Sequence, residues 1–388
     1  MELPKISSAM LILTHSCNLA CRYCFVHQEP CHMTYDTALA ATKFLIKNAE
    51  DSSRKPSITF FGGEPLLAWD TIIVPLTKWI REEYKKPFNL SLTTNGTLLD
   101  EEKLSFMEQN NISFLLSIDG AKETQDYNRP FHSGESSFDR LEPLLPLITR
   151  NFPKTTFRMT TIPATCGHIF ENIQFAQSQG FKSFFVMPNE FEEWSEESLN
   201  TLKKEIRKYG DYYIDSYRNG KTPIYFSSFD RAFEDIKKIN NAILKRQYRT
   251  LKSCQACGKC GLGSSHSASI HPNGNVYGCQ EMTSNVDQDS IFYIGNIFSG
   301  IEDERREALM KLFDSQKAIG ENCVSCKYNR VCNGGCVANN YMINGSLSKV
   351  APVHCQWKII ILEEAIRVMT VLGNEENRGF YEKWNKMK

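Results

Sequence analysis

The sequence has no excess of either charge and no long apolar run. Its 388 residues carry 45 Lys and Arg against 45 Asp and Glu, so the formal net charge is zero. This balance excludes the global basic field of nucleic-acid and anionic-membrane binders. No apolar run approaches the roughly 18 residues that a membrane-spanning helix needs. The apolar patch Ala9–Leu13 is too short for a signal peptide, which predicts a cytoplasmic protein.

The missing export signal decides how the 14 cysteines are interpreted. Cytosolic thiols stay reduced, so a disulfide framework is excluded, and clustered cysteines in that compartment bind metal or do redox chemistry. Four cysteines precede residue 32, nine lie between Cys254 and Cys355, and Cys166 stands alone. The distribution predicts two metal-binding regions separated by a scaffold.

Short apolar runs alternate with amphipathic segments through the first half of the chain. We expect strands at Ala9–His15, Ser57–Gly63, Leu90–Gly96, Ser113–Asp119, Thr156–Ile162 and Lys182–Pro188. Helices are expected at Tyr35–Asn48, Thr71–Tyr84, Glu101–Gln109, Phe138–Thr149 and Ile169–Gln179. Such alternation indicates parallel β/α units, with chemistry at the carboxyl ends of the strands. Six units are too few for a closed barrel, so the predicted fold is α/β, a partial (β/α)6 TIM-type barrel.

The pattern divides the chain into four predicted regions. Residues 1–190 form the partial barrel, and residues 191–250 form a helical bridge. Residues 251–356 are Gly- and Cys-rich with few helix signals, so we expect this domain to fold around metal. Residues 357–388 contain an apolar C-terminal helix.

A C-x3-C-x2-C triplet, Cys17, Cys21 and Cys24, directly follows the first predicted strand. Three thiolates on one loop can face a single inorganic core. A zinc site would need a fourth ligand, which one of three nearby side chains could supply: His27, Cys31 or His32. An iron–sulfur cube held by three cysteines would instead keep one iron open, as a catalytic metal requires.

The triplet, with Tyr23 before its third cysteine, resembles the radical S-adenosylmethionine (SAM) superfamily. Gly62-Gly63-Glu64-Pro65 looks like the GGEP motif of that family, and turns at Thr94–Gly96 and Ser117–Gly120 follow in the right order. The resemblance implies a [4Fe-4S] cluster whose open iron binds SAM, a reducing flavodoxin- or ferredoxin-like partner, and a 5′-deoxyadenosyl radical that abstracts a substrate hydrogen. It implies these cofactor-binding residues: Gly62, Gly63, Glu64, Asn95, Ser117, Asp119 and Arg129.

The second cysteine field resembles the SPASM extension of one radical SAM branch. In that branch the extension carries two auxiliary [4Fe-4S] clusters. The resemblance assigns the first cluster to Cys260, Cys279 and Cys336, and the second to Cys323, Cys326, Cys332 and Cys355. The fourth ligand of the first cluster is Cys254 or Cys257, or that iron has no protein ligand; Cys254 is preferred. A pair of zinc knuckles is the alternative, because an all-cysteine ligand set also suits zinc.

The SPASM branch acts mostly on peptides and proteins, which implies an oxidoreductase-type peptide maturase. We expect a thioether or carbon–carbon cross-link in a ribosomal peptide, because the segments Cys260–Gly263 and Pro272–Tyr277 resemble the corresponding segments of cross-linking peptide maturases. Only sixteen residues precede Cys17, which leaves no room for a leader-recognition domain there. Recognition is expected either from a separate leader-binding protein or from the barrel mouth and the bridge helices.

Formylglycine formation, as in anaerobic sulfatase maturases, is the second prediction. Those enzymes carry an acidic residue after the equivalent of Cys279, whereas this chain has Gln280, which cannot act as a general base. Glu281 is the weak candidate base, and we expect it to point away from Gln280 on an extended chain. Two further alternatives are a small-molecule dehydrogenase, disfavoured by the full cysteine set, and a non-catalytic zinc scaffold.

Overall fold

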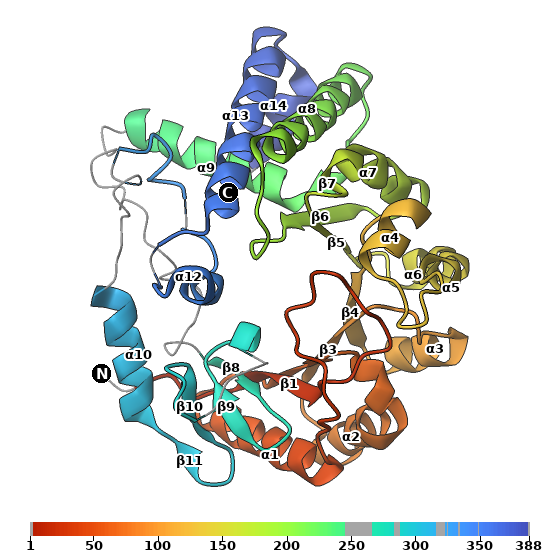
Figure 1. Cartoon of the computed structure of the whole chain (residues 1–388), viewed down its shortest axis with the longest axis vertical. Helices are drawn as coiled ribbons and strands as arrows, with labels where there is room; N and C mark the ends of the chain where they lie inside the picture. The colour runs from red at the N-terminus through yellow and green to blue at the C-terminus, as the bar shows by residue number, and fades with distance from the viewer. Residues whose placement is uncertain are drawn as a thin grey trace. The chain divides into compact units, whose positions relative to one another are not determined.

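The computed structural model describes residues 3–244, 266–282, 288–315, 323, 325–332, 334–347 and 349–386 (Figure 1). These residues form two compact units. The first unit takes its described residues from Met1–Ser117, Arg129–Thr155 and Gly258–Gln316, and the second from Ile118–Asn128, Thr156–Cys257 and Lys317–Lys388. The four-region division that the sequence predicts stays a prediction.

The first unit is built on a sheet whose central strands are parallel. Strands β1 (Ser8–Thr14), β2 (Ser57–Gly62), β3 (Asn89–Thr94) and β4 (Ile112–Ser117) pair in chain order. They lie within two residues of the first four predicted strands. Buried side chains alternate with partly exposed ones along β2, which is the pattern of a strand with one face in the core.

Four later strands extend this sheet beside β1 (Figure 1). Strand β8 (Ser267–Ile270) pairs in parallel with β1. Strands β9 (Asn275–Tyr277), β10 (Tyr293–Asn296) and β11 (Gly300–Ile301) continue it antiparallel. The sequence did not predict these strands, because each is short and its pairing depends on a partner far away in the chain.

Two helices of the first unit begin at a polar side chain that caps them. Thr34 accepts a hydrogen bond from the backbone of Thr37 at the start of α1 (Tyr35–Asp51), and Asp100 caps α3 (Glu101–Gln109) through Lys103 N. The remaining segments, listed with their bounds, are η1 (Pro65–Ala68), η2 (Trp69–Ile73), α2 (Val74–Trp79), η3 (Ile80–Tyr84), α5 (Phe138–Leu141), η4 (Glu142–Leu144), α6 (Leu145–Asn151), η7 (Gln280–Met282) and α10 (Asp303–Ser315). The sequence missed α10.

The second unit contains strands β5 (Phe157–Thr161), β6 (Ser183–Pro188) and β7 (Tyr225–Phe226), all parallel. Strands β5 and β6 confirm the last two predicted strands to within two residues. Its helices are α4 (Lys122–Asn128), η5 (Cys166–His168), α7 (Ile169–Ser178), α8 (Glu196–Arg218), α9 (Ser227–Leu244), α12 (Val337–Asn344), α13 (Pro352–Asn374) and α14 (Arg378–Lys386). The closure of β1–β6 into a partial barrel stays a prediction.

The helices expected in the predicted bridge are α8 and α9, and both pack against α13 (Figure 1). An aromatic cluster fills this junction. Tyr209 and Tyr213 of α8 each lie less than 6 Å, centroid to centroid, from the ring of Phe229 on α9. Large buried rings of this kind stabilise a helix junction through their area and their edge-to-face contacts. None of the described helices combines the length and the apolar character needed to cross a membrane.

Candidate functional site

The cysteine triplet lies on the loop that joins β1 to α1. The stems of this loop pair through the backbone, with His15 N donating to Cys31 O at 3.0 Å. Ala20 N donates to Pro130 O at 2.8 Å, which attaches the middle of the loop to the chain after Arg129. The first unit therefore holds the loop on both sides.

The three thiols are close enough to influence one another. Burial raises the pKa of the Cys17 thiol to about 12, and the charges of Glu64, Cys21 and Cys24 add to the shift. A thiol with so high a pKa stays protonated unless a cation stabilises its thiolate, and a metal centre does so. The donor set therefore fits a positively charged inorganic core.

Two glycines let the end of β2 approach the end of β1. A Cβ atom on Gly62, whose φ is +135°, would lie 2.2 Å from Thr14 O, and one on Gly63 would lie 2.2 Å from Ser16 O. Because neither glycine has a Cβ atom, the two backbones come close enough for Gly63 N to donate to Thr14 O at 2.8 Å. Only glycine fits at these two positions. We call Gly62 and Gly63, with the backbone that they contact at the carboxyl ends of β1 and β2, the glycine cradle.

Glu64 is fully buried and connects β2 to β3. Its carboxylate accepts hydrogen bonds from Thr94 Oγ1 at 2.8 Å, Asn95 N at 2.8 Å and Leu66 N at 3.0 Å. Burial raises the pKa of this carboxyl to about 7, and the three hydrogen bonds oppose the shift. A buried carboxylate of this kind is suited to a cationic ligand group, whose charge would offset the cost of burial.

Asn95 and Arg129 face the cysteine loop from two sides. Asn95 Nδ2 lies 3.7 Å from Cys17 Sγ and donates to Asn18 Oδ1 at 2.9 Å. The Arg129 guanidinium lies 5.1 Å from the centroid of the Tyr23 ring, and its Nη1 lies 3.9 Å from Cys21 Sγ. The first unit thus brings the triplet together with Glu64, Asn95 and Arg129.

Ser117 ends β4, and Asp119 lies two residues beyond it. Ser117 is half-buried as the last residue of the strand. Asp119, in the second unit, is completely buried, and its carboxylate accepts hydrogen bonds from Thr160 N and Asn128 Nδ2, both at 3.0 Å. These contacts hold the turn after β4, and the role of both residues toward SAM stays a prediction.

Four of the predicted auxiliary ligands lie close together within the second unit. Burial raises the pKa of Cys355, and the charges of Cys332, Cys323 and Cys326 add to the shift, so these four thiols are neighbours. These are the four cysteines that the resemblance assigns to the second auxiliary cluster. Cys336 lies in the same unit as the N-cap of α12, and Cys279 lies in the first unit. Cys254, Cys257 and Cys260 lie outside the described residues.

The predicted orientation of Glu281 is wrong. Gln280–Met282 forms one turn of 3-10 helix, η7, rather than an extended chain. Successive side chains in such a turn are separated by about 120°, not 180°. Gln280 Nε2 therefore donates to Glu281 Oε1 at 3.3 Å, and Glu281 N lies 3.5 Å from Cys279 Sγ. Glu281 remains a candidate acid–base group beside Cys279.

Sequence reasoning missed a buried polar group in the second unit. Glu190, two residues beyond β6, accepts from Asn339 Nδ2 at 2.9 Å and pairs with His354 Nδ1 at 2.7 Å. Asn339 lies in the first turn of α12, and His354 directly precedes Cys355. The signal available in the sequence was the position of Glu190, just after a strand end.

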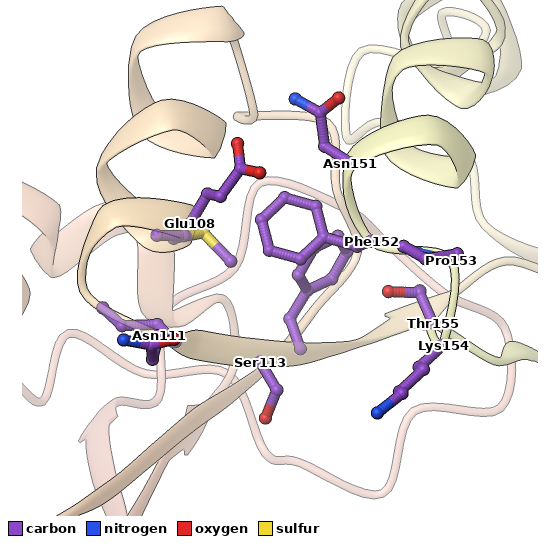
Figure 2. Close-up of a pocket in the computed structure, with 11 residues that line it drawn as sticks. Glu108, Asn111, Ser113, Asn151, Phe152, Pro153, Lys154 and Thr155 are labelled. Carbon is purple, nitrogen blue, oxygen red and sulfur yellow. The ribbon is translucent and has the colours of Figure 1, made fainter.

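A cleft of about 370 Å³ lies elsewhere in the first unit (Figure 2). It is lined by residues of α3, by Ile112–Phe114 at the amino end of β4, and by 151–155 after α6. Phe152 occupies its centre in Figure 2, with Glu108 beside it. The predicted site residues lie at the carboxyl ends of the strands, so this cleft takes no part in the site.

This arrangement is that of a radical SAM domain. The model of the radical SAM superfamily matches residues 11–176, which contain the triplet, the glycine cradle and Arg129. The chain therefore carries a radical SAM domain in its first half, and it is an enzyme.

Relatives of known function match most of the chain. The cysteine-type anaerobic sulfatase-maturating enzyme of Clostridium perfringens (strain 13 / Type A) is 24% identical over 357 residues, covering 86% of this chain and 89% of the relative. The radical SAM cyclopropyl synthase TigE of Paramaledivibacter caminithermalis is 23% identical, covering 86% and 68%. The solved structure of native anSMEcpe with bound AdoMet and the Cp18Cys peptide is 25% identical with a TM-score of 0.72, covering 95% and 99%.

Proposed function

We propose that this enzyme is a peptide or protein maturase that oxidises a residue of its substrate by radical SAM chemistry. The observation that carries the proposal is the similarity, over 95% of this chain, to a structure that holds both AdoMet and a peptide. The buried carboxylate, guanidinium and cysteine triplet of the first unit support the same chemistry.

The cysteine triplet, Glu64 and Arg129 of the first unit each have a distinct role in this proposal. Cys17, Cys21 and Cys24 hold a [4Fe-4S] cluster with one open iron. Glu64 accepts the ammonium group of SAM, whose charge offsets the burial of the carboxylate, and Arg129 pairs with the SAM carboxylate. When bound, SAM and the cluster supply a 5′-deoxyadenosyl radical after one-electron reduction. The partial barrel is the expected scaffold.

The Cys-rich segments supply two auxiliary [4Fe-4S] clusters in this proposal. Cys323, Cys326, Cys332 and Cys355 bind the second cluster, which their mutual proximity supports. Cys260, Cys279 and Cys336 bind the first, with Cys254 as the preferred fourth ligand. An external reductant of flavodoxin or ferredoxin type supplies the electrons.

Of the two candidate products, formylglycine is the one that we favour. The C. perfringens maturase and this chain match along nearly their whole lengths. In the turn η7 the Glu281 carboxylate accepts a hydrogen bond from the Gln280 side chain, so a carboxylate lies beside the residue that follows Cys279 although residue 280 itself is not acidic. A carboxylate there can take a substrate proton, whereas glutamine cannot.

A thioether or carbon–carbon cross-link stays the second candidate. It is favoured by Gln280 itself and by the similarity to TigE, a cyclopropyl synthase. The separate leader-binding protein belongs to this candidate alone.

Mass spectrometry of a modified peptide distinguishes the two products. Anaerobically reconstituted enzyme is incubated with SAM, a reductant and Cys-containing peptides, including those encoded beside its gene. Conversion of Cys to an aldehyde with loss of sulfur indicates formylglycine, whereas loss of two hydrogens with sulfur retained indicates a cross-link. If the reconstituted protein holds zinc rather than iron and sulfide and forms no 5′-deoxyadenosine, the zinc scaffold is correct instead.

A further inference from the structure

Three side chains outside the predicted cluster ligands meet at the base of the cysteine loop. His15 directly follows β1, and Glu29 and Cys31 lie on the segment that leads from the loop to α1. One imidazole nitrogen, one carboxylate oxygen and the thiol sulfur of these residues all lie within 4.8 Å of one another. His15 Nδ1 and Glu29 Oε1 are 2.9 Å apart.

The backbone holds these side chains in place from both stems of the loop. Met33 N donates to Leu13 O at 2.8 Å, and His15 N donates to Cys31 O at 3.0 Å. Ser16 Oγ also donates to Glu29 O at 3.3 Å. The three side chains therefore close the base of the loop that carries the triplet, and their proximity does not depend on flexible chain ends.

The donor set is suited to a borderline-soft divalent cation. Imidazole nitrogen, carboxylate oxygen and thiolate sulfur are the three ligand types that proteins offer to zinc, and three protein ligands leave the fourth tetrahedral position to water. Burial raises the pKa of the Cys31 thiol, and the Glu29 charge adds to the shift. A dication beside Cys31 would offset the charge of its thiolate.

A second buried imidazole lies beside the three side chains. The ring of His271, the residue after β8, packs edge-on against the His15 ring with centroids 6.1 Å apart. Each of the two residues is 6% exposed, and the Nε2 atoms of both are buried without a hydrogen-bond partner among the described residues. Burial, with a smaller effect of His15, lowers the pKa of His271 to about 3, so it stays a neutral imidazole. Two orphaned ring nitrogens are costly unless a further ligand or water is present.

We propose that His15, Glu29 and Cys31 bind one zinc ion, with water as the fourth ligand. The ion would link the two stems of the cysteine loop at its base, apart from the three thiols of the triplet. Glu29 is half-exposed, which gives the ion a path from solvent. The site lies outside the proposed function and does not depend on which product the enzyme forms.

Zinc analysis of the holoenzyme tests the site. Anaerobically reconstituted protein is incubated with zinc, washed with a chelator and assayed for zinc, iron and sulfide. We expect one retained zinc per chain, and at least ~10-fold weaker zinc binding after Cys31→Ser or Glu29→Gln, with iron and sulfide unchanged. Cobalt in place of zinc should show thiolate-to-metal absorption that Cys31→Ser abolishes.

Cys166→Ser is the matched control, because Cys166 is a buried thiol of the second unit that donates to Pro163 O. It should leave zinc binding unchanged. Glu29→Gln alters an exposed side chain and keeps the fold, so its result stands if Cys31→Ser proves unstable.

Zinc retention equal in wild type, Cys31→Ser and Glu29→Gln would overturn the proposal, as would no retained zinc. A joint loss of zinc and iron in Cys31→Ser would make Cys31 a cluster ligand instead. Failure of SAM cleavage, by contrast, would affect only the proposed function.

Discussion

The two cysteine regions of this chain are held in different ways. The loop with Cys17, Cys21 and Cys24 follows a central strand, and long-range hydrogen bonds fix it to neighbouring segments. The segment with Cys323, Cys326 and Cys332 includes short-range contacts, such as Tyr328 N to Cys326 Sγ at 3.4 Å, and an ion pair between Lys327 and Glu363 of α13 at 3.2 Å. The fold can therefore preorganise the first region, whereas we expect the order of the second to depend on the metal that we propose for it.

The largest expected effect separates the tasks of the two regions. Cys21→Ala should abolish SAM cleavage, because the catalytic cluster loses one of its three protein ligands. Cys326→Ala should keep some SAM cleavage while product formation stops, since only an auxiliary cluster is damaged. Chromatography of 5′-deoxyadenosine and mass spectrometry of the peptide measure both. Normal maturation by the Cys326 variant would refute the auxiliary-cluster assignment.

Removal of metal should affect the second region more than the first. After anaerobic chelation, we expect amide hydrogen exchange to accelerate across residues 323–355 and to stay slow in β1–β4, because buried sheet hydrogen bonds do not depend on the cluster. Hydrogen-exchange mass spectrometry before and after chelation gives the comparison. Equal loss of protection in both regions would show that metal folds the first region too.

The stability of cluster-free, SAM-free protein should fall as pH rises from about 4.5 to about 7. Within this window the folded state keeps the Glu64 proton that the unfolded state has lost, because burial raises the pKa of Glu64 from its ordinary value of 4.5 to about 7 in the folded state. The full effect is about 3 kcal/mol and is complete above pH 7. Urea unfolding at several pH values measures it, and Glu64→Gln should show a flatter dependence.

Glu64→Gln should also weaken SAM binding by about 30-fold, since a charge-assisted hydrogen bond worth about 2 kcal/mol is lost. Equilibrium dialysis of the reconstituted enzyme measures the affinity. Glu101→Gln, which changes an exposed carboxylate of α3, is the matched control and should bind SAM normally. Unchanged affinity in Glu64→Gln would remove Glu64 from the SAM site.

The smallest effect concerns the second region. Glu190→Gln should lower kcat by about 10-fold with the KM for SAM unchanged, because it weakens the contact that orients His354 beside Cys355. The electron paramagnetic resonance signal of the auxiliary clusters should shift, and Glu190→Asp should restore part of the rate. A normal signal with a lowered melting temperature would indicate a purely structural role.

Much of the fold was predictable from local pattern. Apolar runs placed all six strands β1–β6 within two residues, because each strand end coincides with residues that favour turns. The η7 turn was mispredicted because three residues are too few for a periodicity to show. The pairing of β8 with β1 was missed for a different reason: a four-residue strand gains its stability from its partner.

The sequence by itself determined the chemistry that the site can use, since the spacing of Cys17, Cys21 and Cys24 and the Gly-Gly-Glu-Pro run are local properties of the chain. Only the tertiary structure decided which distant groups share a site. Thr94 and Asn95 anchor Glu64, and Glu29 and Cys31 meet His15, because strand register and loop closure bring those segments together. Spacing along a chain specifies which ligands are available, whereas through-space distances follow from how the sheet and its loops pack.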